Sequence, residues 1–277
     1  MRWLVVRGGA LGDFILTLPA LEAVRAVADH LTLAASPRYA ALRPDLSDAV
    51  VDLRGTGALW LFGAGRPPGP LPDAALVFTP EVAEVLAALG VPQIRVAAPR
   101  PPPGVHAAAH LHAPVADLAP LTPPRLEAGP APDLPAPWPV VLAPGAASPD
   151  KVWPGFARLA ALLAEAGVSH VWAPGVDEAP PRLQGPVLAG LDLAGLRGLA
   201  GAAGVWVGND TGTTHLAAAV GAPTLALFGP TDPRCWAPPG ARVLPFSASP
   251  EEVFTHVLCA RPSHRDNRLL TLRAATN

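Results

Sequence analysis

Residues 3–28 read WLVVRGGALGDFILTLPALEAVRAVA and carry the clearest signal of the chain's architecture. Residues 3–6 are a short apolar run of the kind that forms a buried strand. A glycine-rich segment follows at 8–13, and residues 14–28 then carry apolar side chains at helical spacing. A strand, a glycine loop and a helix in this order open a βαβ unit, whose two strands lie parallel. The stretch therefore predicts an α/β protein.

The same pattern continues through the first half of the chain and restarts in the second half. Short runs predict the further strands, at residues 31–34, 49–51, 74–78, 94–97, 140–143, 168–173, 205–207, 223–228 and 242–245. Helical spacing predicts the further helices, at residues 81–89, 106–118, 156–166, 193–203, 213–220 and 250–258. This alternation predicts two doubly wound, Rossmann-like α/β domains with parallel sheets. We expect the first at 1–136, with a proline-rich linker at its end near 130–137, and the second at 137–277.

Length, charge and cysteine content exclude several classes of protein. The 277 residues suffice for two domains, and a formal net charge of −2 gives no electrostatic footprint for a nucleic-acid partner. No apolar run reaches the roughly 18 residues of a membrane span, and we recognise no secretory signal. Two cysteines, Cys235 and Cys259, are too few for a disulfide scaffold or a zinc site built on thiolates. We therefore expect a cytoplasmic protein with reduced thiols.

Three histidines lie close together in the predicted helix at residues 106–118, namely His106, His110 and His112. No carboxylate or cysteine stands in register with them to complete a metal site. We therefore interpret them as an exposed helix face and expect no bound metal.

The glycine loop at residues 8–13 matches neither common phosphate-binding loop. No Gly-Lys-Ser/Thr follows it, and its glycine spacing departs from the dinucleotide fingerprint, so an NAD-dependent oxidoreductase is a poor interpretation. A tight strand-to-helix turn explains Gly9 and Gly12. Asp13, at the start of the helix, is either a helix cap or an ionised general base at the carboxyl edge of the sheet, where ligands bind.

A second candidate region is the loop at residues 143–154, directly after the first strand of the second domain. It is rich in small residues, and Gly145 allows the backbone to approach a ligand. Lys151 is the single lysine among 20 basic residues, which suggests a position that arginine could not fill. It would bring a mobile point charge to a phosphate. The alternative is a solvated lysine in a loop.

A third candidate region, residues 208–215, reads GNDTGTTH and turns from a strand into a helix. The free backbone N–H groups at the start of that helix would face an anion, with the helix dipole behind them, at Thr211, Gly212 and Thr213. Asp210 can accept hydrogen bonds from sugar hydroxyls, and His215 can reach a phosphate or a leaving group. A helix cap is the alternative for Asp210, and a buried core histidine is the alternative for His215.

A fourth region, residues 228–233, reads FGPTDP and ends the next strand. Its turn residues suffice for a structural explanation. Because it lies at the same sheet edge as the third region, we also expect Gly229 to contact a ligand.

Residues 7–21, 143–154, 210–219 and 228–233 resemble, in this order, four motifs of glycosyltransferase family 9, the heptosyltransferases. The resemblance implies the GT-B fold, in which two Rossmann-like domains face a cleft. It implies transfer of a heptose-like sugar, with inversion, from a nucleotide-diphosphate donor that is typically ADP-linked. The acceptor would be lipopolysaccharide core or another glycan. No catalytic metal and no cofactor would be needed.

Carried onto this sequence, the resemblance makes Asp13 the base that deprotonates the acceptor hydroxyl and Lys151 the cation that neutralises the donor diphosphate. It assigns donor binding to Gly145, Asp210, Thr211, Gly212, Thr213, His215 and Gly229. Gly9 and Gly12 belong to the acceptor-side loop. The expected partners are a nucleotide sugar and a glycan or glycolipid acceptor. Peripheral contact with a membrane, at its inner face, is a further option.

Two other functions fit parts of this pattern. A nucleotide-sugar epimerase has the same two-domain fold, although we find no acid–base set of that kind in the sequence. A non-catalytic protein that binds nucleotide sugars would use the second domain but has no need of a base in the first. The presence of both Asp13 and Lys151 therefore favours the transferase.

Overall fold

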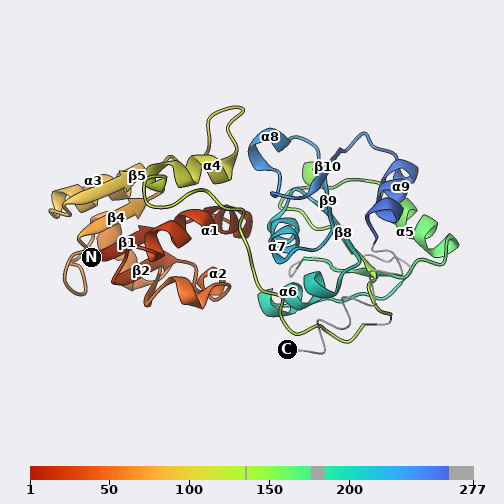
Figure 1. The fold of residues 1–277 in the computed structure, drawn as a ribbon, viewed down its shortest axis with the longest axis horizontal. Coiled ribbons are helices and arrows are strands. Elements are labelled where there is room, and N and C mark those ends of the chain that lie inside the picture. The colour runs from red at the N-terminus through yellow and green to blue at the C-terminus, as the bar shows by residue number, and fades with distance from the viewer. Residues whose placement is uncertain (135, 176–184, 262–277) are drawn as a thin grey trace. The chain divides into compact units, whose positions relative to one another are not determined.

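The computed structural model describes residues 1–134, 136–175 and 185–261. The chain forms two compact units, one of Met1–Leu126 with Asp232–Pro239 and one of Glu127–Thr231 with Gly240–Asn277. We call them the first and the second domain and describe each by itself (Figure 1). The boundary between the two domains lies after Leu126. The proline-rich segment at 130–137 follows this boundary and therefore belongs to the second domain.

The first domain is built on a parallel five-stranded sheet in the order β3-β2-β1-β4-β5. Its strands are β1 (Arg2–Val6), β2 (His30–Ala35), β3 (Ala49–Asp52), β4 (Ala74–Val77) and β5 (Gln93–Val96). The central strands β1 and β4 are buried on both faces apart from Arg2. This burial explains their continuous apolar sequence, which is typical of parallel sheets covered on both sides.

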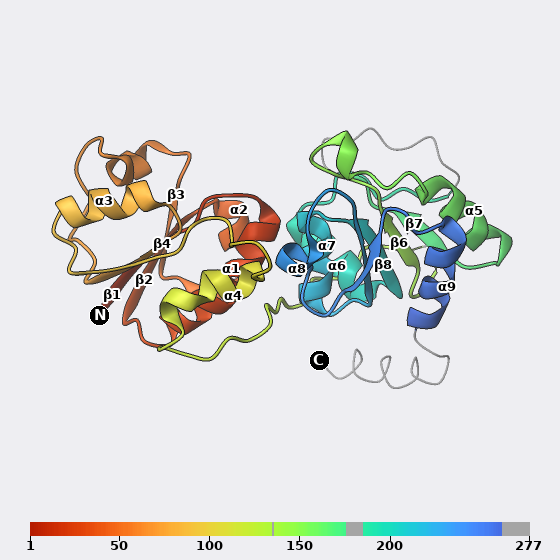
Figure 2. The same cartoon turned by 90° about the horizontal axis from the view of Figure 1, so that it is seen from above.

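Helices cover both faces of this first sheet (Figure 2). On one face α1 (Leu11–Arg25) packs with α4 (Ala107–His112), and on the other α3 (Pro80–Ala88) packs with the 3-10 helix η2 (Thr56–Phe62). The shorter elements of the domain are α2 (Pro37–Ala40), η1 (Pro44–Leu46), η3 (Ala113–Val115) and α8 (Pro233–Trp236). The sheet is therefore sandwiched between two helical layers.

The second domain repeats this architecture with a different strand order, β10-β9-β8-β6-β7, again all parallel. Its strands are β6 (Val140–Ala143), β7 (His170–Trp172), β8 (Val205–Asn209), β9 (Thr224–Phe228) and β10 (Arg242–Pro245). Its helices are η4 (Pro149–Lys151), α5 (Phe156–Glu165), α6 (Leu193–Ala202), α7 (Gly212–Val220) and α9 (Pro250–Ala260). The helices pair as α5 with α9 and α6 with α7.

The two doubly wound parallel-sheet domains confirm the predicted fold class, and each predicted strand is present. Two predicted helices differ. The first begins at Leu11, not Phe14, so that Gly12 and Asp13 lie inside its first turn. The prediction of one helix over 106–118 is wrong, because α4 ends at His112 and a 3-10 turn containing Pro114 follows. Proline has no N–H to continue the helical ladder, and its ring clashes with the preceding turn.

The order of strands reverses once in each sheet, between β1 and β4 in the first and between β6 and β8 in the second. At such a switch point a crevice opens outside the carboxyl ends of the strands, and open α/β sheets bind ligands there. Asp13 follows β1, Lys151 follows β6, and Asp210 follows β8 directly. The topology of each domain thus places its predicted site residues at its switch point.

None of the helices formed by residues 1–134, 136–175 and 185–261 is long and apolar enough to cross a membrane.

Candidate functional site

The second domain gathers three polar side chains around the carboxylate of Asp210. Lys151 Nζ lies 3.2 Å from Asp210 Oδ2, and Thr231 Oγ1 donates a hydrogen bond of 2.6 Å to the same oxygen. His215 Nε2 lies 4.0 Å from the other oxygen, Oδ1. The four residues come from η4, from α7 and from the loops after β8 and β9. A lysine, a carboxylate and two further polar groups therefore meet at one point of the sheet edge.

Helix α7 begins immediately beside this carboxylate. Thr211 is its N-cap residue, but its side chain makes no capping hydrogen bond to the helix backbone. The first N–H groups of a helix have no intrahelical acceptor, so those of Gly212 and Thr213 are free to bind an anion. The hydroxyls of Thr211 and Thr213 lie 3.0 Å apart. This helix start, with Lys151 near it, has the chemistry of a phosphate site.

The buried side chain of Asn209 fixes the loop that carries Lys151. Its Nδ2 donates to the carbonyl of Pro144 at 2.7 Å and to that of Gly145 at 3.3 Å, and its Oδ1 accepts from the N–H of Trp153 at 3.0 Å. These bonds tie both ends of the loop to the end of β8. Sequence reasoning missed this residue, although an asparagine that ends an otherwise apolar strand was a usable signal.

Gly229, predicted as a donor contact, has a clear packing requirement. A Cβ at this position would lie 2.5 Å from the ring of Phe246, closer than real atoms approach. Close approach of the two chain segments therefore explains this glycine by itself, and its contact with a donor stays a prediction.

In the first domain, Asp13 occupies the third position of α1 rather than the N-cap, which is Ala10. Its Oδ2 accepts a hydrogen bond of 2.9 Å from the N–H of Ala10. Gly9 has φ = 99°, and a Cβ there would lie 2.7 Å from the same Oδ2. Only glycine adopts this backbone conformation readily and leaves room for the carboxylate. The Asp13 side chain remains 28% exposed, so one face of it is accessible.

Arg7, at the end of β1, contacts Asp13 from inside the domain. Its Nη2 lies 3.4 Å from Asp13 Oδ1 and donates to the backbone carbonyl of Asp13 at 3.3 Å. The guanidinium also lies over the ring of Phe78, 5.2 Å from its centroid. Burial lowers the pKa of Arg7, and the charge of Asp13 opposes that shift. Arginine still keeps its charge at neutral pH, so a cation and a carboxylate face each other here.

The predicted site residues thus form two clusters, one in each domain. Asp13 with Gly9 and Gly12 belongs to the first domain. The second domain holds Lys151 and the remaining predicted residues, of which Asp210, Thr211, Gly212, Thr213 and His215 lie within one turn of the start of α7. The residues that sequence reasoning missed, Arg7, Asn209 and Thr231, each contact a member of one of these clusters.

The interpretation of the three histidines as an exposed helix face is wrong. His106 is the N-cap of α4, and its ring Nε2 lies 2.8 Å from the carbonyl of Ala237. His112 is only 3% exposed because α4 packs against α1. Among the described residues, no group of three or more His, Cys, Asp and Glu side chains is arranged to hold a metal ion.

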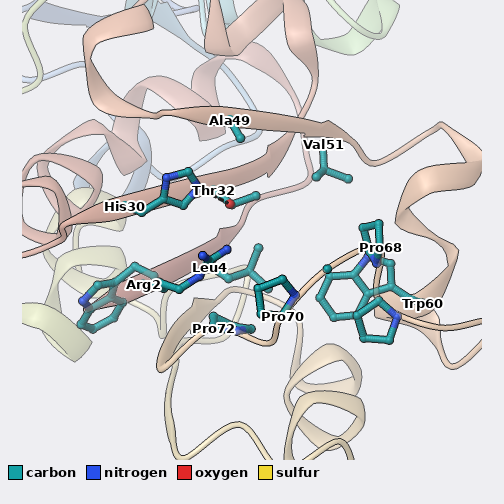
Figure 3. A pocket seen from close by; sticks show the side chains of 13 residues that line it. Arg2, Leu4, His30, Thr32, Ala49, Val51, Trp60, Pro68, Pro70 and Pro72 are labelled. Carbon is teal, nitrogen blue, oxygen red and sulfur yellow. Dashed lines mark hydrogen bonds between the residues drawn. The ribbon is translucent and has the colours of Figure 1, made fainter.

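A cavity of about 230 Å³ lies at the other end of the first sheet (Figure 3). Arg2 and His30, the first residues of β1 and β2, line it together with Trp60 of η2 and the proline-rich segment 67–72. Because Asp13 follows the carboxyl end of β1, this cavity is separate from the loop that carries Asp13.

Comparison with known proteins gives a family match for the second domain. The model of glycosyltransferase family 9 (heptosyltransferase) matches residues 131–259. This range contains Lys151, Asp210 and Thr231 but not Asp13. No curated protein sequence matches the chain.

Three solved structures are similar to the chain over 94% of its length. One is a family 9 glycosyl transferase from Veillonella parvula, with a TM-score of 0.73 and 18% identity over 96% of that chain. The second is ADP-heptose lipopolysaccharide heptosyltransferase II from E. coli, with a TM-score of 0.71 and 20% identity over 98% of that chain. The third is the E. coli heptosyltransferase WaaC with ADP, with a TM-score of 0.71 and 20% identity over all of that chain.

At these identities the structural matches show the fold, and they cover both domains. The family match covers residues 131–259 of the chain, which include the three motifs that the sequence analysis found in the second domain. Residues 131–259 are therefore a glycosyltransferase family 9 domain, and the chain shares the two-domain GT-B fold of solved heptosyltransferases.

Proposed function

We propose that the protein is an inverting glycosyltransferase that moves a heptose-like sugar from a nucleotide-diphosphate donor to a glycan acceptor. The observation that carries the proposal is the pairing of Lys151 with Asp210 beside the start of α7, within the family 9 domain. A cation and free helix N–H groups can bind the negative oxygens of a diphosphate. A carboxylate next to them can accept hydrogen bonds from the hydroxyls of the attached sugar.

The second domain binds the donor in this proposal. The N–H groups of Gly212 and Thr213 bind phosphate oxygens, and the ammonium group of Lys151 moves from Asp210 toward the diphosphate. Asp210 then accepts hydrogen bonds from the sugar, while Thr231 keeps its Oδ2 in place. Two of the solved relatives, E. coli WaaC with ADP and with ADP-2-deoxy-2-fluoro heptose, were studied with adenine nucleotides. An ADP-linked sugar is therefore the first donor to test.

The reaction needs one proton acceptor and one stabilised leaving group. Asp13 takes the proton of the acceptor hydroxyl as its oxygen attacks the anomeric carbon. The bond from that carbon to the diphosphate oxygen breaks on the opposite face, which inverts the configuration. The nucleoside diphosphate leaves with the electron pair, and Lys151 and the start of α7 stabilise the negative charge. These groups supply the positive charge without a divalent metal, and we propose that neither a metal nor another cofactor takes part.

The acceptor in this proposal is lipopolysaccharide core or another glycan or glycolipid, bound by the first domain near Asp13. Gly9 lies in the loop before α1, and Gly12 lies in the first turn of that helix. A Cβ at position 9 would lie 2.7 Å from Asp13 Oδ2, so glycine there leaves room for the carboxylate, whose accessible face can meet an acceptor hydroxyl.

A panel of nucleotide sugars tests the donor side first. A ligand that binds only the folded protein stabilises it by about 2.7 kcal/mol at 100 times its Kd, so the right donor stands out in thermal unfolding. The same panel is then incubated with candidate glycan acceptors, with and without EDTA, and the anomeric configuration of the product is determined by NMR. Net inversion in EDTA is the expected result.

Three results would contradict the proposal. Retention of configuration or a strict metal requirement would overturn the mechanism. Conversion of the nucleotide sugar into an epimer without any acceptor would identify an epimerase. Tight donor binding with no turnover on any acceptor would identify a non-catalytic binding protein.

A further inference from the structure

Thr214, in the first turn of α7, is buried and directs its hydroxyl back to the strand that precedes the helix. Its Oγ1 donates a hydrogen bond of 2.7 Å to the backbone carbonyl of Asn209, the last residue of β8. Both residues are 0% exposed. Loss of the hydroxyl would leave a buried carbonyl short of a hydrogen bond, which costs more than the same loss at the surface. The bond therefore fixes the first turn of α7 to the end of β8.

Gly208 leaves the space that this bond needs. A Cβ at position 208 would lie 2.3 Å from Thr214 Oγ1, closer than real atoms approach. With any other residue at this position, the hydroxyl of Thr214 would have to move away from the Asn209 carbonyl. The first glycine of the sequence GNDTGTTH at 208–215 is thus explained by the threonine six positions later.

The end of β8 is a firm anchor because this strand lies in the centre of the second sheet. Gly208 pairs with Ala143 of β6 on one side and with Ala226 of β9 on the other. The N–H of Asp210, the residue that follows β8, donates to the carbonyl of Leu227 at 3.1 Å. A helix turn that is bonded here is therefore held by both neighbouring strands.

Asn209 joins the two groups that offer positive charge to an anion, the ammonium group of Lys151 and the start of α7. Its side chain bonds Gly145 and Trp153 in the loop that carries Lys151. Its backbone carbonyl holds α7 through Thr214. Both groups are therefore set relative to one residue at the end of the central strand.

We propose that Thr214 is a positioning residue for the phosphate groups of the donor, an inference that rests on the proposed function. Because it is buried, it does not touch the ligand itself. It keeps the N–H groups of Gly212 and Thr213 in a fixed place relative to Lys151, so that all of them meet the same diphosphate. Binding groups act together only when the residues behind them hold them in place, and small displacements are costly.

Isothermal titration with free nucleoside diphosphates tests this on the full-length protein. ADP, GDP, UDP and dTDP are compared first, and the one that binds most tightly is used for all variants. Thr214→Val, which has nearly the same shape but no hydroxyl, should bind it roughly five- to tenfold more weakly, the usual scale for one lost hydrogen bond. Thr214→Ser keeps the hydroxyl and should bind normally. Gly208→Ala, which displaces the hydroxyl from the opposite side, should weaken binding as Thr214→Val does.

Thr224→Val is the matched control. Thr224 is also buried in the second domain, and its hydroxyl donates to a backbone carbonyl, that of Ala222, at 2.8 Å. It is the first residue of β9 and lies at the opposite end of the sheet from the site. Thr224→Val should therefore lose a similar amount of melting temperature but keep its affinity for the nucleoside diphosphate.

Thermal unfolding checks that each variant is folded, and Thr214→Ala, which has no γ atom near the carbonyl, takes the place of Thr214→Val if valine is not accommodated. Normal nucleoside diphosphate binding by the folded variant would overturn the role of Thr214 and leave the proposed transfer untouched. An equal loss of affinity in Thr224→Val would also overturn it, since reduced stability would then explain the effect. If the unchanged protein bound none of the four nucleoside diphosphates, the proposed donor site would fall together with the role of Thr214.

Discussion

Nη2 of Arg7 lies 3.4 Å from Oδ1 of Asp13, and Arg7 itself is only 4% exposed. The arginine approaches from the inside of the domain, so it leaves the outer face of the carboxylate free. It also bonds the backbone carbonyl of Asp13 and lies over the ring of Phe78. Arg7 is therefore a positioning residue for the candidate base rather than a group that meets a substrate.

Replacing Arg7 by lysine should separate positioning from charge. Arg7→Lys keeps the positive charge but loses the planar guanidinium that reaches Asp13 and stacks on Phe78. Because small misplacements of a catalytic group are costly, we expect kcat to fall by about 10- to 100-fold. The affinity for the donor, which the second domain binds in our proposal, should not change. Arg38→Lys, on an exposed arginine of the same domain, is the control and should leave both quantities unchanged.

Asp13 itself is tested with Asp13→Asn. The amide oxygen of asparagine can still accept the N–H of Ala10, but it cannot take a proton. Transfer should therefore fall by about 10²–10⁴-fold, while donor affinity stays near that of the unchanged protein. The buried Arg7 loses its anion, so the melting temperature should also fall, and Arg7→Met/Asp13→Asn should recover part of that loss. A folded Asp13→Asn protein with normal turnover would show that the base lies elsewhere.

The sequence predicted both sheets because buried parallel strands and their helices leave a strong, local pattern of apolar residues. Asp13 and Asp210 were predicted for a related reason, since Asp13 begins the helix after β1 and Asp210 directly follows β8, and parallel sheets bind ligands at these strand ends. The contacts of Asn209 and Thr231 could not be read in this way. Asn209 bonds Trp153, which is 56 positions away, and Thr231 bonds Asp210, which is 21 positions away. Such pairings depend on how loops converge in space.

The buried state of His112 escaped prediction for a different physical reason. Helical spacing shows that residues share a face, but the face that packs is decided by the neighbouring element. Here α1 covers α4, and the histidines were assigned to the wrong environment. Arg7 was overlooked in the same way, because a charged residue at the end of a strand is normally solvated.

Burial of His112 predicts a dependence of stability on pH. Desolvation lowers the pKa of His112 below its usual range, so the folded protein holds this ring neutral. In the unfolded chain the ring takes up a proton near its ordinary pKa of about 6.5. The unfolded state then binds more protons, and the free energy of unfolding falls as the pH drops below about 6.5. His112→Met should show a smaller loss of melting temperature between pH 7 and pH 5 than the unchanged protein, and an equal loss in the two proteins would contradict this prediction.

Lys151→Ala should weaken binding of the donor and of the free nucleoside diphosphate alike, because the lysine is proposed to bind the diphosphate that both share. The side chain is partly exposed, so its removal should change the melting temperature little. Arg242→Ala, on an exposed cation of the same domain, is the matched control and should bind both ligands normally. Isothermal titration of the two ligands decides the matter, and an unchanged affinity for the nucleoside diphosphate would remove Lys151 from the site.

Thr231→Val should give the complementary result. The hydroxyl of Thr231 donates to Asp210 Oδ2, the oxygen that also faces Lys151, and valine has the same shape without that hydrogen bond. Asp210 should then hold the donor sugar less well, and a lost hydrogen bond to a charged group corresponds to roughly a tenfold or larger loss of affinity. Affinity for the free nucleoside diphosphate, which has no sugar for Asp210 to bind, should stay unchanged. Thr231→Ser restores the hydroxyl and should restore donor binding. Equal weakening of both ligands by Thr231→Val would mean that the threonine supports the phosphate site instead of the carboxylate.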